Sequence, residues 1–192
     1  MKGNDTMKQY IGTKIVEAEP ATLYELKDGG HYLKKHSEEW PEESANIPEL
    51  SSSTREGYAV RYADGYESWS PKDVFERAYL PISINENLGT DKPSIGQQMV
   101  DDFISEVEVT TMGQKTTVVR AVLRNGFEIV ESSSCVSPEN YSEELGAQLC
   151  MDKIKDKVWE LLGFLLQTGV QGVKSWRDHP ELAKKYLEDG DI

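Results

Sequence analysis

Residue types that could carry nucleophilic or metal chemistry are few in this chain. It has three histidines, His31, His36 and His179, and two cysteines, Cys135 and Cys150. No histidine lies on a periodic hydrophobic face beside a serine or cysteine that it could activate, and Cys135 has no adjacent base to form a thiolate. His31 and His36 share one polar segment, which is weak evidence for a metal site. We therefore expect no catalytic residues, no metal and no cofactor.

The motifs of nucleotide-using enzymes are missing from the sequence as well. It contains no GxxxxGK[ST], no GxGxxG after a predicted strand and no HExxH. MGQKTT, at residues 112–117, combines Gly, Lys and Thr but lacks the first glycine and the helix of a phosphate-binding loop. Well-marked secondary structure without such a motif favours a binding protein over an enzyme.

One polar segment could bind an anion. Residues 132–140, SSSCVSPEN, lead into the start of a predicted helix. Small hydroxyls at a helix N-terminus can hold a phosphate without a lysine. Serines are also common at strand ends, and Asn140 is already a good helix cap, so a purely structural role stays open.

The charge narrows the choice of partner. The formal net charge is −13, which disfavours nonspecific binding to nucleic-acid phosphates. The simplest interpretation is a solvated acidic surface. A mimic of DNA would need ordered rows of carboxylates, whereas here acids alternate with lysines, as in EELGAQLCMDKIKDK.

The remaining composition indicates a cytoplasmic protein without a membrane partner. No apolar run reaches the roughly 18 residues of a spanning helix, and residues 1–10 lack the apolar core of a signal peptide. The two cysteines show no disulfide framework, so reduced thiols are expected.

The first folded segment, residues 8–82, is predicted to be a small strand-rich module. YIGTKIVEAEP predicts a strand that stops at Pro20. Residues 29–55 carry Pro, Ser, Glu and paired glycines without a period, which predicts a long loop. GYAVRYADGYESW predicts two strands joined by a type I′ turn at Asp64 and Gly65.

A short helix is expected after these strands. Ser70 can cap it and Pro71 suits its first position, and the helix should end near Tyr79. Residues 82–93 contain Asn, Gly, Asp and Pro, which predicts a linker.

The second folded segment, residues 94–168, is predicted to contain a helix, a hairpin and a second helix. Ser94 and Gln97 have capping-box spacing before a helical period. Residues 106–110 alternate as a strand, and residues 115–123 form the next strand.

The Asn125–Gly126 pair predicts a hairpin with a two-residue turn. That turn would pair Arg124 with Phe127, Val122 with Ile129, and Arg120 with Glu131. Val119, Ala121, Leu123 and Val130 would then share the opposite face. Both faces are partly apolar, so one should be covered by the following helix and the other by a subunit, the first module or a ligand. Arg120 is either in a surface pair worth about 0.5 kcal/mol or, in a groove, a phosphate ligand.

The second helix is expected to start at Asn140, with Glu143 in capping-box spacing. Its apolar stripe would be Tyr141, Leu145, Leu149, Ile154, Val158, Leu161 and Leu162. Gly163 should end it, with a return strand at residues 164–167, and residues 171–192 would be a peripheral tail. These elements predict an α+β fold, with a small antiparallel sheet packed on a long amphipathic helix after the strand-rich module.

A family resemblance runs through VVRAVLRNG and FEIVESSSCVSPENYSEELGAQLCMDKIKDKVWELLGFLL. This pattern resembles the phage gene-49/gene-66 family over about residues 94–166. It is also similar to the first Thoeris anti-defence protein of phages. The N-terminal pattern GYxVxYxDGYxSWSPKxVFExAY resembles a module that phages often place before this domain.

The resemblance implies a function. Such proteins bind cyclic ADP-ribose signals, and in some cases cyclic oligonucleotides, without cleaving them, and they assemble as homo-oligomers in the host cytoplasm. It implies that Phe127 stacks on a base and Asn140 hydrogen-bonds the ligand, and that Arg120, Arg124 and Lys157 contact phosphates. Two other classes stay open, namely an acidic inhibitor or adaptor that docks on a host protein and, least favoured, an enzyme acting on a nucleotide.

Overall fold

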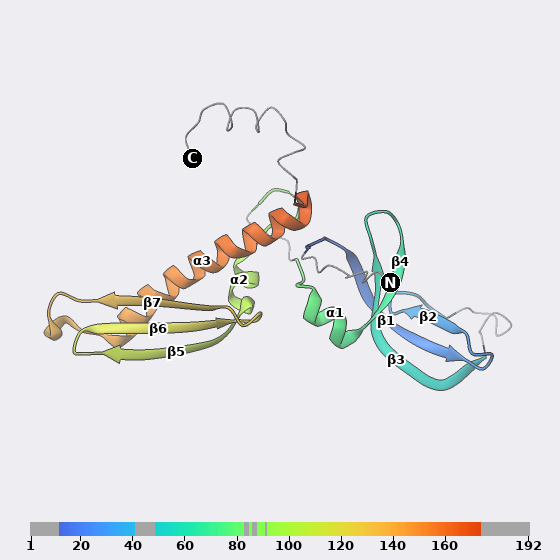
Figure 1. Ribbon diagram of the computed structural model, residues 1–192, viewed down its shortest axis with the longest axis horizontal. Helices are drawn as coiled ribbons and strands as arrows, with labels where there is room; N and C mark the ends of the chain where they lie inside the picture. Colours follow the sequence, from blue (N-terminus) through green and yellow to red (C-terminus); the bar gives the residue numbers. More distant parts are fainter. Residues whose placement is uncertain (1–11, 41–48, 83–84, 86–87, 91, 174–192) are drawn as a thin grey trace, which may run out of the picture. The chain divides into compact units, whose positions relative to one another are not determined.

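The computed structural model describes residues 12–40, 49–82, 85, 88–90 and 92–173 (Figure 1). These residues divide into two compact units: Lys14–Pro81 form one, and residues 12–13 together with those from Ile82 onward form the other. Each unit combines an antiparallel sheet with helical structure, which confirms the predicted α+β class. Among the described helices, none has the length and hydrophobicity that would let it cross a membrane.

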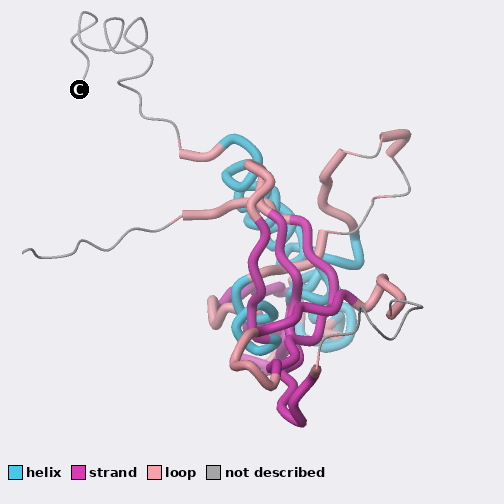
Figure 2. The backbone as a smooth tube through the Cα atoms, turned by 90° about the vertical axis from the view of Figure 1, so that its right-hand side faces the viewer, coloured by secondary structure: helices cyan, strands magenta, loops and turns pink. Residues whose placement is uncertain are grey.

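The N-terminal unit is a four-stranded antiparallel sheet followed by one short helix. Its strands are β1 (Glu17–Leu26), β2 (His31–Lys35), β3 (Leu50–Arg61) and β4 (Glu67–Pro71), in the spatial order β2-β1-β3-β4. Helix α1 (Lys72–Ala78) contacts β3 and β4. Figure 2 distinguishes the strands, in magenta, from the helices, in cyan, in both units.

Two predictions for the first strands were wrong. Strand β1 passes through Pro20 instead of stopping there. The Pro20 carbonyl accepts a hydrogen bond from His36 N at 2.9 Å, one residue beyond the end of β2. Proline has no N–H to donate, but at Pro20 this side of β1 faces the position just after the end of β2. No hydrogen bond between the two strands is therefore lost.

The predicted loop at residues 29–55 contains β2 and the beginning of β3. Five residues of β2 pair with β1, from Glu25 with His31 to Ala21 with Lys35. A strand this short shows too little alternation to be recognised in a polar sequence. Residues 41–48 of the predicted loop lie outside the described residues.

Helix α1 ends before Tyr79 as predicted, but its start is displaced by one residue. Ser70 is not the cap, because it pairs with Tyr58 inside the sheet, and Pro71 stands at the N-cap without a side-chain capping bond. Phe75 on α1 stacks on Tyr58 with ring centroids 4.2 Å apart, which holds the helix on this face of the sheet.

The C-terminal unit contains a three-stranded antiparallel sheet and a long helix. Its elements are α2 (Gln97–Phe103), β5 (Ile104–Met112), β6 (Thr116–Leu123), β7 (Glu128–Ser134), a 3-10 turn (Pro138–Asn140) and α3 (Glu143–Gln171). The strand order is β5-β6-β7. Helix α3 packs on β6 and β7 (Figure 1). The N-cap of α2 is Gly96, not the predicted Ser94, and it makes no side-chain capping bond.

The hairpins at Asp64–Gly65 and Asn125–Gly126, predicted to have two-residue turns, use one and the same longer turn. Leu123 N donates to Phe127 O and Gly126 N donates to Leu123 O, each at 2.8 Å. Gly126 has a φ of 82°, and among the described residues no non-glycine has a positive φ. A three-residue loop with glycine in the left-handed region, ending in a bulge, produces this pattern. Residues 62–66 repeat it around Gly65.

The longer turn shifts the β6–β7 register by one residue from the prediction. Val122 pairs with Glu128, Ala121 with Ile129, Arg120 with Val130 and Val119 with Glu131. The predicted pairs Val122–Ile129 and Arg120–Glu131 are therefore wrong. Glu131 and Ile129 join the helix-facing side, whereas Arg120 and Val130 face away from α3.

A strict alternation on β6 builds the core. Thr117, Val119, Ala121 and Leu123 are buried, and the residues between them are partly exposed. Against them α3 buries Gly146, Cys150, Ile154, Val158 and Leu162, one side chain per turn. A Cβ on Gly146 would lie 2.2 Å from Thr117 Oγ1, so the glycine lets α3 touch β6.

Three predictions for α3 were wrong. The cap is Ser142, whose Oγ accepts from Leu145 N at 3.2 Å, and Asn140 lies in the preceding 3-10 turn. The helix continues through Gly163 to Gln171, so there is no strand at residues 164–167. The predicted stripe shares only Ile154, Val158 and Leu162 with the buried row, because Gly146 rather than Leu145 faces the sheet.

Candidate functional site

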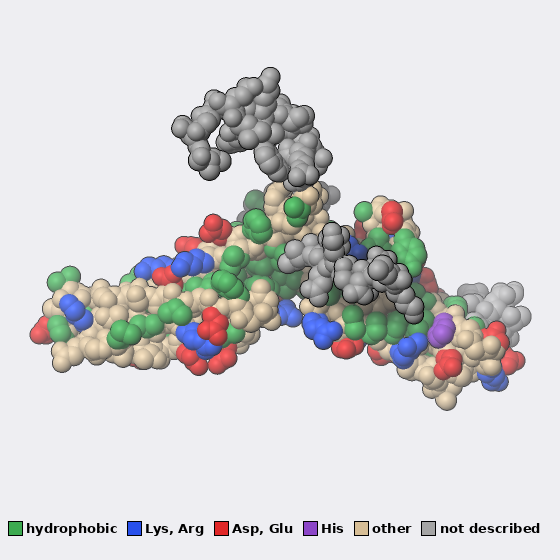
Figure 3. Space-filling view, in the orientation of Figure 1, with side chains coloured by type: hydrophobic (Ala, Val, Ile, Leu, Met, Phe, Trp, Pro, Cys, Tyr) green, Lys and Arg blue, Asp and Glu red, His purple; other side chains and the backbone are tan. Residues whose placement is uncertain are grey.

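The candidate site is an open groove between β7 and the second half of α3, which we call the α3–β7 groove. Its volume is about 560 Å³. It is lined by Phe127, Glu128, Ile129, Val130, Lys157, Glu160, Leu161 and Phe164. Figure 3 shows hydrophobic side chains at the surface of the molecule, interspersed with charged ones.

Two phenylalanines give the groove its aromatic character. Phe127 is 54% exposed and Phe164 is 74% exposed. Phe127 follows the hairpin turn, where its N–H donates to Asn125 Oδ1 at 3.0 Å and so fixes the backbone that carries the ring. Phe164 belongs to the groove because α3 does not stop at Gly163. Exposed aromatic rings are available for stacking.

Acidic groups outnumber basic ones at the groove. Lys157 Nζ hydrogen-bonds the carboxylate of Glu131, and this bond holds the pKa of Glu131 below its usual value. Glu160 adds a carboxylate to the lining, and Glu128, which also lines the groove, has its carboxylate bonded to Arg120. An anion would meet a free cation only if Lys157 left Glu131, so the aromatic rings are the stronger feature of this site.

Arg120 lies on the sheet face opposite α3 and is already paired with two carboxylates. Its Nε donates to Glu128 at 2.9 Å and its Nη1 to Glu108 at 3.1 Å. The hydrogen bond to Glu128, and then the one to Glu108, raise the pKa of Arg120, and the same pairing lowers the pKa of Glu128. Two acceptors on one guanidinium leave little capacity for a phosphate.

The structure brings two of the five predicted residues, Phe127 and Lys157, into the groove. Arg124 is exposed in the hairpin turn next to it. Asn140 stands before the first turn of α3, whereas the groove lies near Leu161 and Phe164. Twenty helical residues span about 30 Å, so Asn140 and Phe127 are not in one pocket.

The helix start offers no open anion site of the expected kind. Ser142 caps it, and Glu143 and Glu144 occupy the first turn. Thr111 hydrogen-bonds both Glu143 and Tyr141, and Tyr141 also contacts the buried Thr117 at 3.0 Å. These side chains tie α3 to β5 and β6. Among the described residues there is no group of three metal-ligating side chains.

Sequence reasoning missed Val130, Leu161 and Phe164 as lining residues. The one-residue register error grouped Val130 with the residues Val119 and Ala121, which are buried, whereas Val130 is exposed. The expected helix end at Gly163 removed Phe164 from α3. The signal against that end was available: four further residues, FLLQ, suit a helix well, and a glycine within a helix is tolerated.

Exposed hydrophobic side chains also lie outside the groove, on β5 and on the first half of α3. Because α3 covers β6 and β7, the helix-facing residues of the edge strand β5 remain partly exposed, namely Val107 and Val109. Leu145 and Leu149 on α3 are exposed as well. Helix α3 therefore leaves apolar side chains exposed on two elements of this unit, which are candidate contact residues for a partner.

Residues 95–170 match the model of a family described as Phage protein (N4 Gp49/phage Sf6 gene 66) family. The matched segment includes α2, the β5-β6-β7 sheet and nearly all of α3, and so it includes the α3–β7 groove. No curated protein and no solved structure matches the chain.

Proposed function

Because residues 95–170 belong to the phage gene-49/66 family, we propose that this phage protein captures a small nucleotide ligand in the α3–β7 groove without converting it. The finer proposal is a cyclic nucleotide that serves as a bacterial immune signal, either a cyclic ADP-ribose isomer or a cyclic oligonucleotide. Capture of such a signal would make the protein an anti-defence factor in the host cytoplasm.

The observation that carries the proposal is the pair of exposed rings at one groove. A base stacked on Phe127 or Phe164 would gain about 1–3 kcal/mol. The volume of about 560 Å³ is within the range of small-molecule sites. Sequestration requires affinity and stoichiometry but no turnover, which agrees with the lack of catalytic motifs in the sequence.

The pairing of Lys157 with Glu131 provides a specific test of whether the groove binds a phosphorylated ligand. A phosphate must draw Lys157 away from Glu131, so Glu131→Gln should tighten binding of a phosphorylated ligand. The same substitution should leave the affinity for the matching nucleoside unchanged, because a base stacks without needing the lysine.

Native mass spectrometry with cyclic ADP-ribose isomers and cyclic oligonucleotides tests the proposal, and it also reports the oligomeric state, which we expect to be a homo-oligomer. A bound ligand should be released intact on heating. Phe127→Ala and Phe164→Ala should each weaken binding about tenfold or more. Leu145→Ala, at an exposed position on the same helix outside the groove, is the matched control. No binding across the panel, altered ligand, or equal affinities of all three variants would overturn the proposal.

A second candidate is an acidic inhibitor or adaptor that docks on a host protein. Exposed hydrophobic residues on β5 (Val107 and Val109) and on α3 (Leu145 and Leu149) favour it, since they are available for contact on a chain with a net charge of −13. In that case Leu145→Ala would reduce partner binding and the two phenylalanine variants would not.

A further inference from the structure

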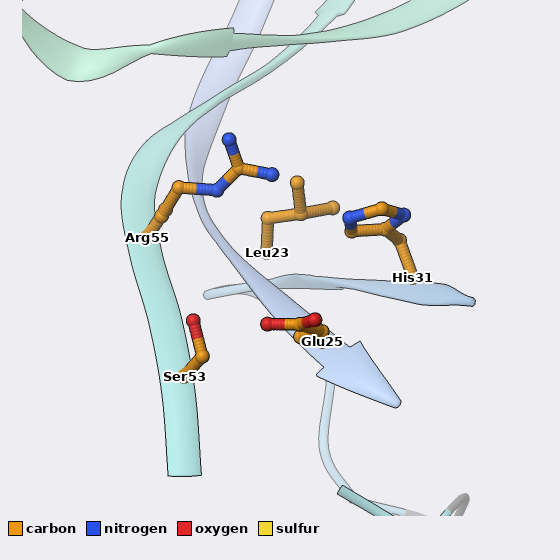
Figure 4. Close-up of a pocket in the computed structure, with 5 residues that line it drawn as sticks. All are labelled: Leu23, Glu25, His31, Ser53 and Arg55. Atoms are coloured by element: carbon orange, nitrogen blue, oxygen red, sulfur yellow. The ribbon is translucent and has the colours of Figure 1, made fainter. Parts of the chain in front are cut away.

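The N-terminal unit has a hollow on its sheet that the proposed function does not use. It has a volume of about 350 Å³ and is lined by Leu23 and Glu25 of β1, His31 of β2, and Ser53 and Arg55 of β3. Figure 4 shows the Arg55 and His31 side chains extending toward each other over Leu23, with Glu25 and Ser53 nearby. We call this site the β1–β3 hollow.

Strand register explains why these side chains meet. Leu23 pairs with Arg55 on one side of β1, and Glu25 pairs with His31 on the other. Directly paired residues share a face, and so do residues two apart on a strand. The central strand β1 therefore brings polar groups from both of its neighbours onto one face.

The Arg55 guanidinium is held in place by an aromatic ring. It lies over Trp69 of β4, 5.1 Å from the ring centroid. Trp69 itself is fixed by close packing on Gly57, where a Cβ would come within 2.7 Å of the indole. The indole N–H is buried and has no acceptor among the described residues. Packing rather than hydrogen bonding therefore sets the position of the Trp69 ring beneath Arg55.

Arg55 differs from the other cations on these strands. Lys35 pairs with Glu67, Arg61 pairs with Glu17, and Lys34 donates to the carbonyl oxygens of Lys35 and Glu38. Arg55 has no such ion pair with a described residue. A guanidinium that is stacked and preorganised but lacks a carboxylate partner is suited to bidentate binding of an external oxyanion.

From this arrangement we infer that the β1–β3 hollow binds a small phosphate monoester with a hydroxyl group near the phosphate. The Arg55 fork, the Ser53 hydroxyl and a His31 ring nitrogen can donate to phosphate oxygens. The Glu25 carboxylate would repel a bare phosphate but would accept a hydrogen bond from a neighbouring hydroxyl. Sugar phosphates and nucleoside monophosphates share this chemistry, and a hollow of this size suits small molecules.

Isothermal titration of the full chain with ribose 5-phosphate tests the inference, with ribose and inorganic phosphate as controls. Only ribose 5-phosphate should give saturable heat at low millimolar concentration. Adenosine 5′-monophosphate distinguishes a sugar phosphate from a nucleoside monophosphate as the ligand. If it binds with the same affinity as ribose 5-phosphate, the hollow is a sugar-phosphate site. If it binds more tightly, the hollow also recognises a base.

Two variants identify the groups involved. Arg55→Gln should weaken binding about tenfold or more, since it removes charge-assisted bonds, whereas Arg77→Gln, at an exposed arginine of α1, should not change it. Glu25→Gln should weaken the binding of ribose 5-phosphate and strengthen the binding of inorganic phosphate. Misfolding cannot produce opposite changes in the two affinities. The inference fails if ribose 5-phosphate gives no saturable heat, if Arg55→Gln behaves like Arg77→Gln, or if Glu25→Gln shifts both ligands in the same direction.

Discussion

Helix α3 packs so closely on β6 at Gly146 that a larger side chain there should destabilise the fold. In an exposed helix interior, replacing glycine by alanine stabilises a protein by about 1 kcal/mol. At Gly146 the new Cβ would lie 2.2 Å from Thr117 Oγ1 and 2.7 Å from Thr117 Cβ. Carbon atoms in contact are normally about 3.5–4 Å apart, so α3 would have to move away from β6.

The gain in helix propensity and the cost of overpacking oppose each other. Their relative sizes decide whether Gly146→Ala stabilises or destabilises the protein. Overpacking a filled core costs about 1–3 kcal/mol, and Thr117 is fully buried between β6 and α3. We expect Gly146→Ala to lower the free energy of unfolding by about 1–2 kcal/mol, because the displaced helix also loosens Cys150 and Ile154. For a unit of this size the midpoint temperature should fall by about 5–15 °C.

Gly163 provides a matched control on the same helix. A Cβ there would meet nothing within 4 Å, so Gly163→Ala should stabilise the protein by up to about 1 kcal/mol. Thermal unfolding followed by circular dichroism at 222 nm measures both variants, since α3 supplies most of the described helical residues. In a Thr117→Ala background, which removes the nearest atom, Gly146→Ala should cost less. If Gly146→Ala stabilises as much as Gly163→Ala, then α3 does not approach β6 at this point.

Two further predictions concern the start of α3 and its contact with α2. Ser142→Ala should cost about 1 kcal/mol of unfolding free energy and Asn140→Ala almost nothing, as measured by urea denaturation; the reverse order would contradict the assigned cap. The hydrogen bond from Lys155 lowers the pKa of Asp101, so this pair stabilises the fold above the unfolded pKa of Asp101, and its contribution is lost as the pH falls through the lower folded pKa. Because both groups are exposed, Asp101→Asn should cost at most about 0.5 kcal/mol at pH 7 and nothing at pH 2, and a constant cost across that range would refute the pairing.

The strong local signals in the sequence identified most of the C-terminal unit. Alternation on Lys115–Leu123 corresponds to β6, and the long helical period corresponds to α3. The class of fold follows from these periods because each requires one buried face. The exact start and end of α3 did not follow, since several polar residues before it can cap a helix and local sequence does not distinguish Ser142 from Asn140.

The candidate site was harder to predict than the fold. Phe127 and Lys157 were identified, but their neighbours depend on a turn type that Asn125–Gly126 does not determine. Asn-Gly suits a two-residue turn, yet here the Asn125 side chain accepts from Phe127 N and the loop takes one more residue. The β1–β3 hollow could not be found at all, because β2 was not recognised as a strand and Trp69, in β4, contacts Arg55 of β3 only through the folded sheet.

The bulged turn at residues 123–127 also restricts how this protein can change over time. Exposed loop tips usually tolerate insertions and deletions. Here, losing one residue would exchange the two faces of β7, moving Val130 under α3 and Ile129 and Glu131 out of the core. Lys157 would lose its carboxylate partner at the same time. The tip of this loop is exposed to solvent, but the packing of β7 against α3 requires its present length. Substitutions in the loop should therefore be accepted far more readily than insertions or deletions.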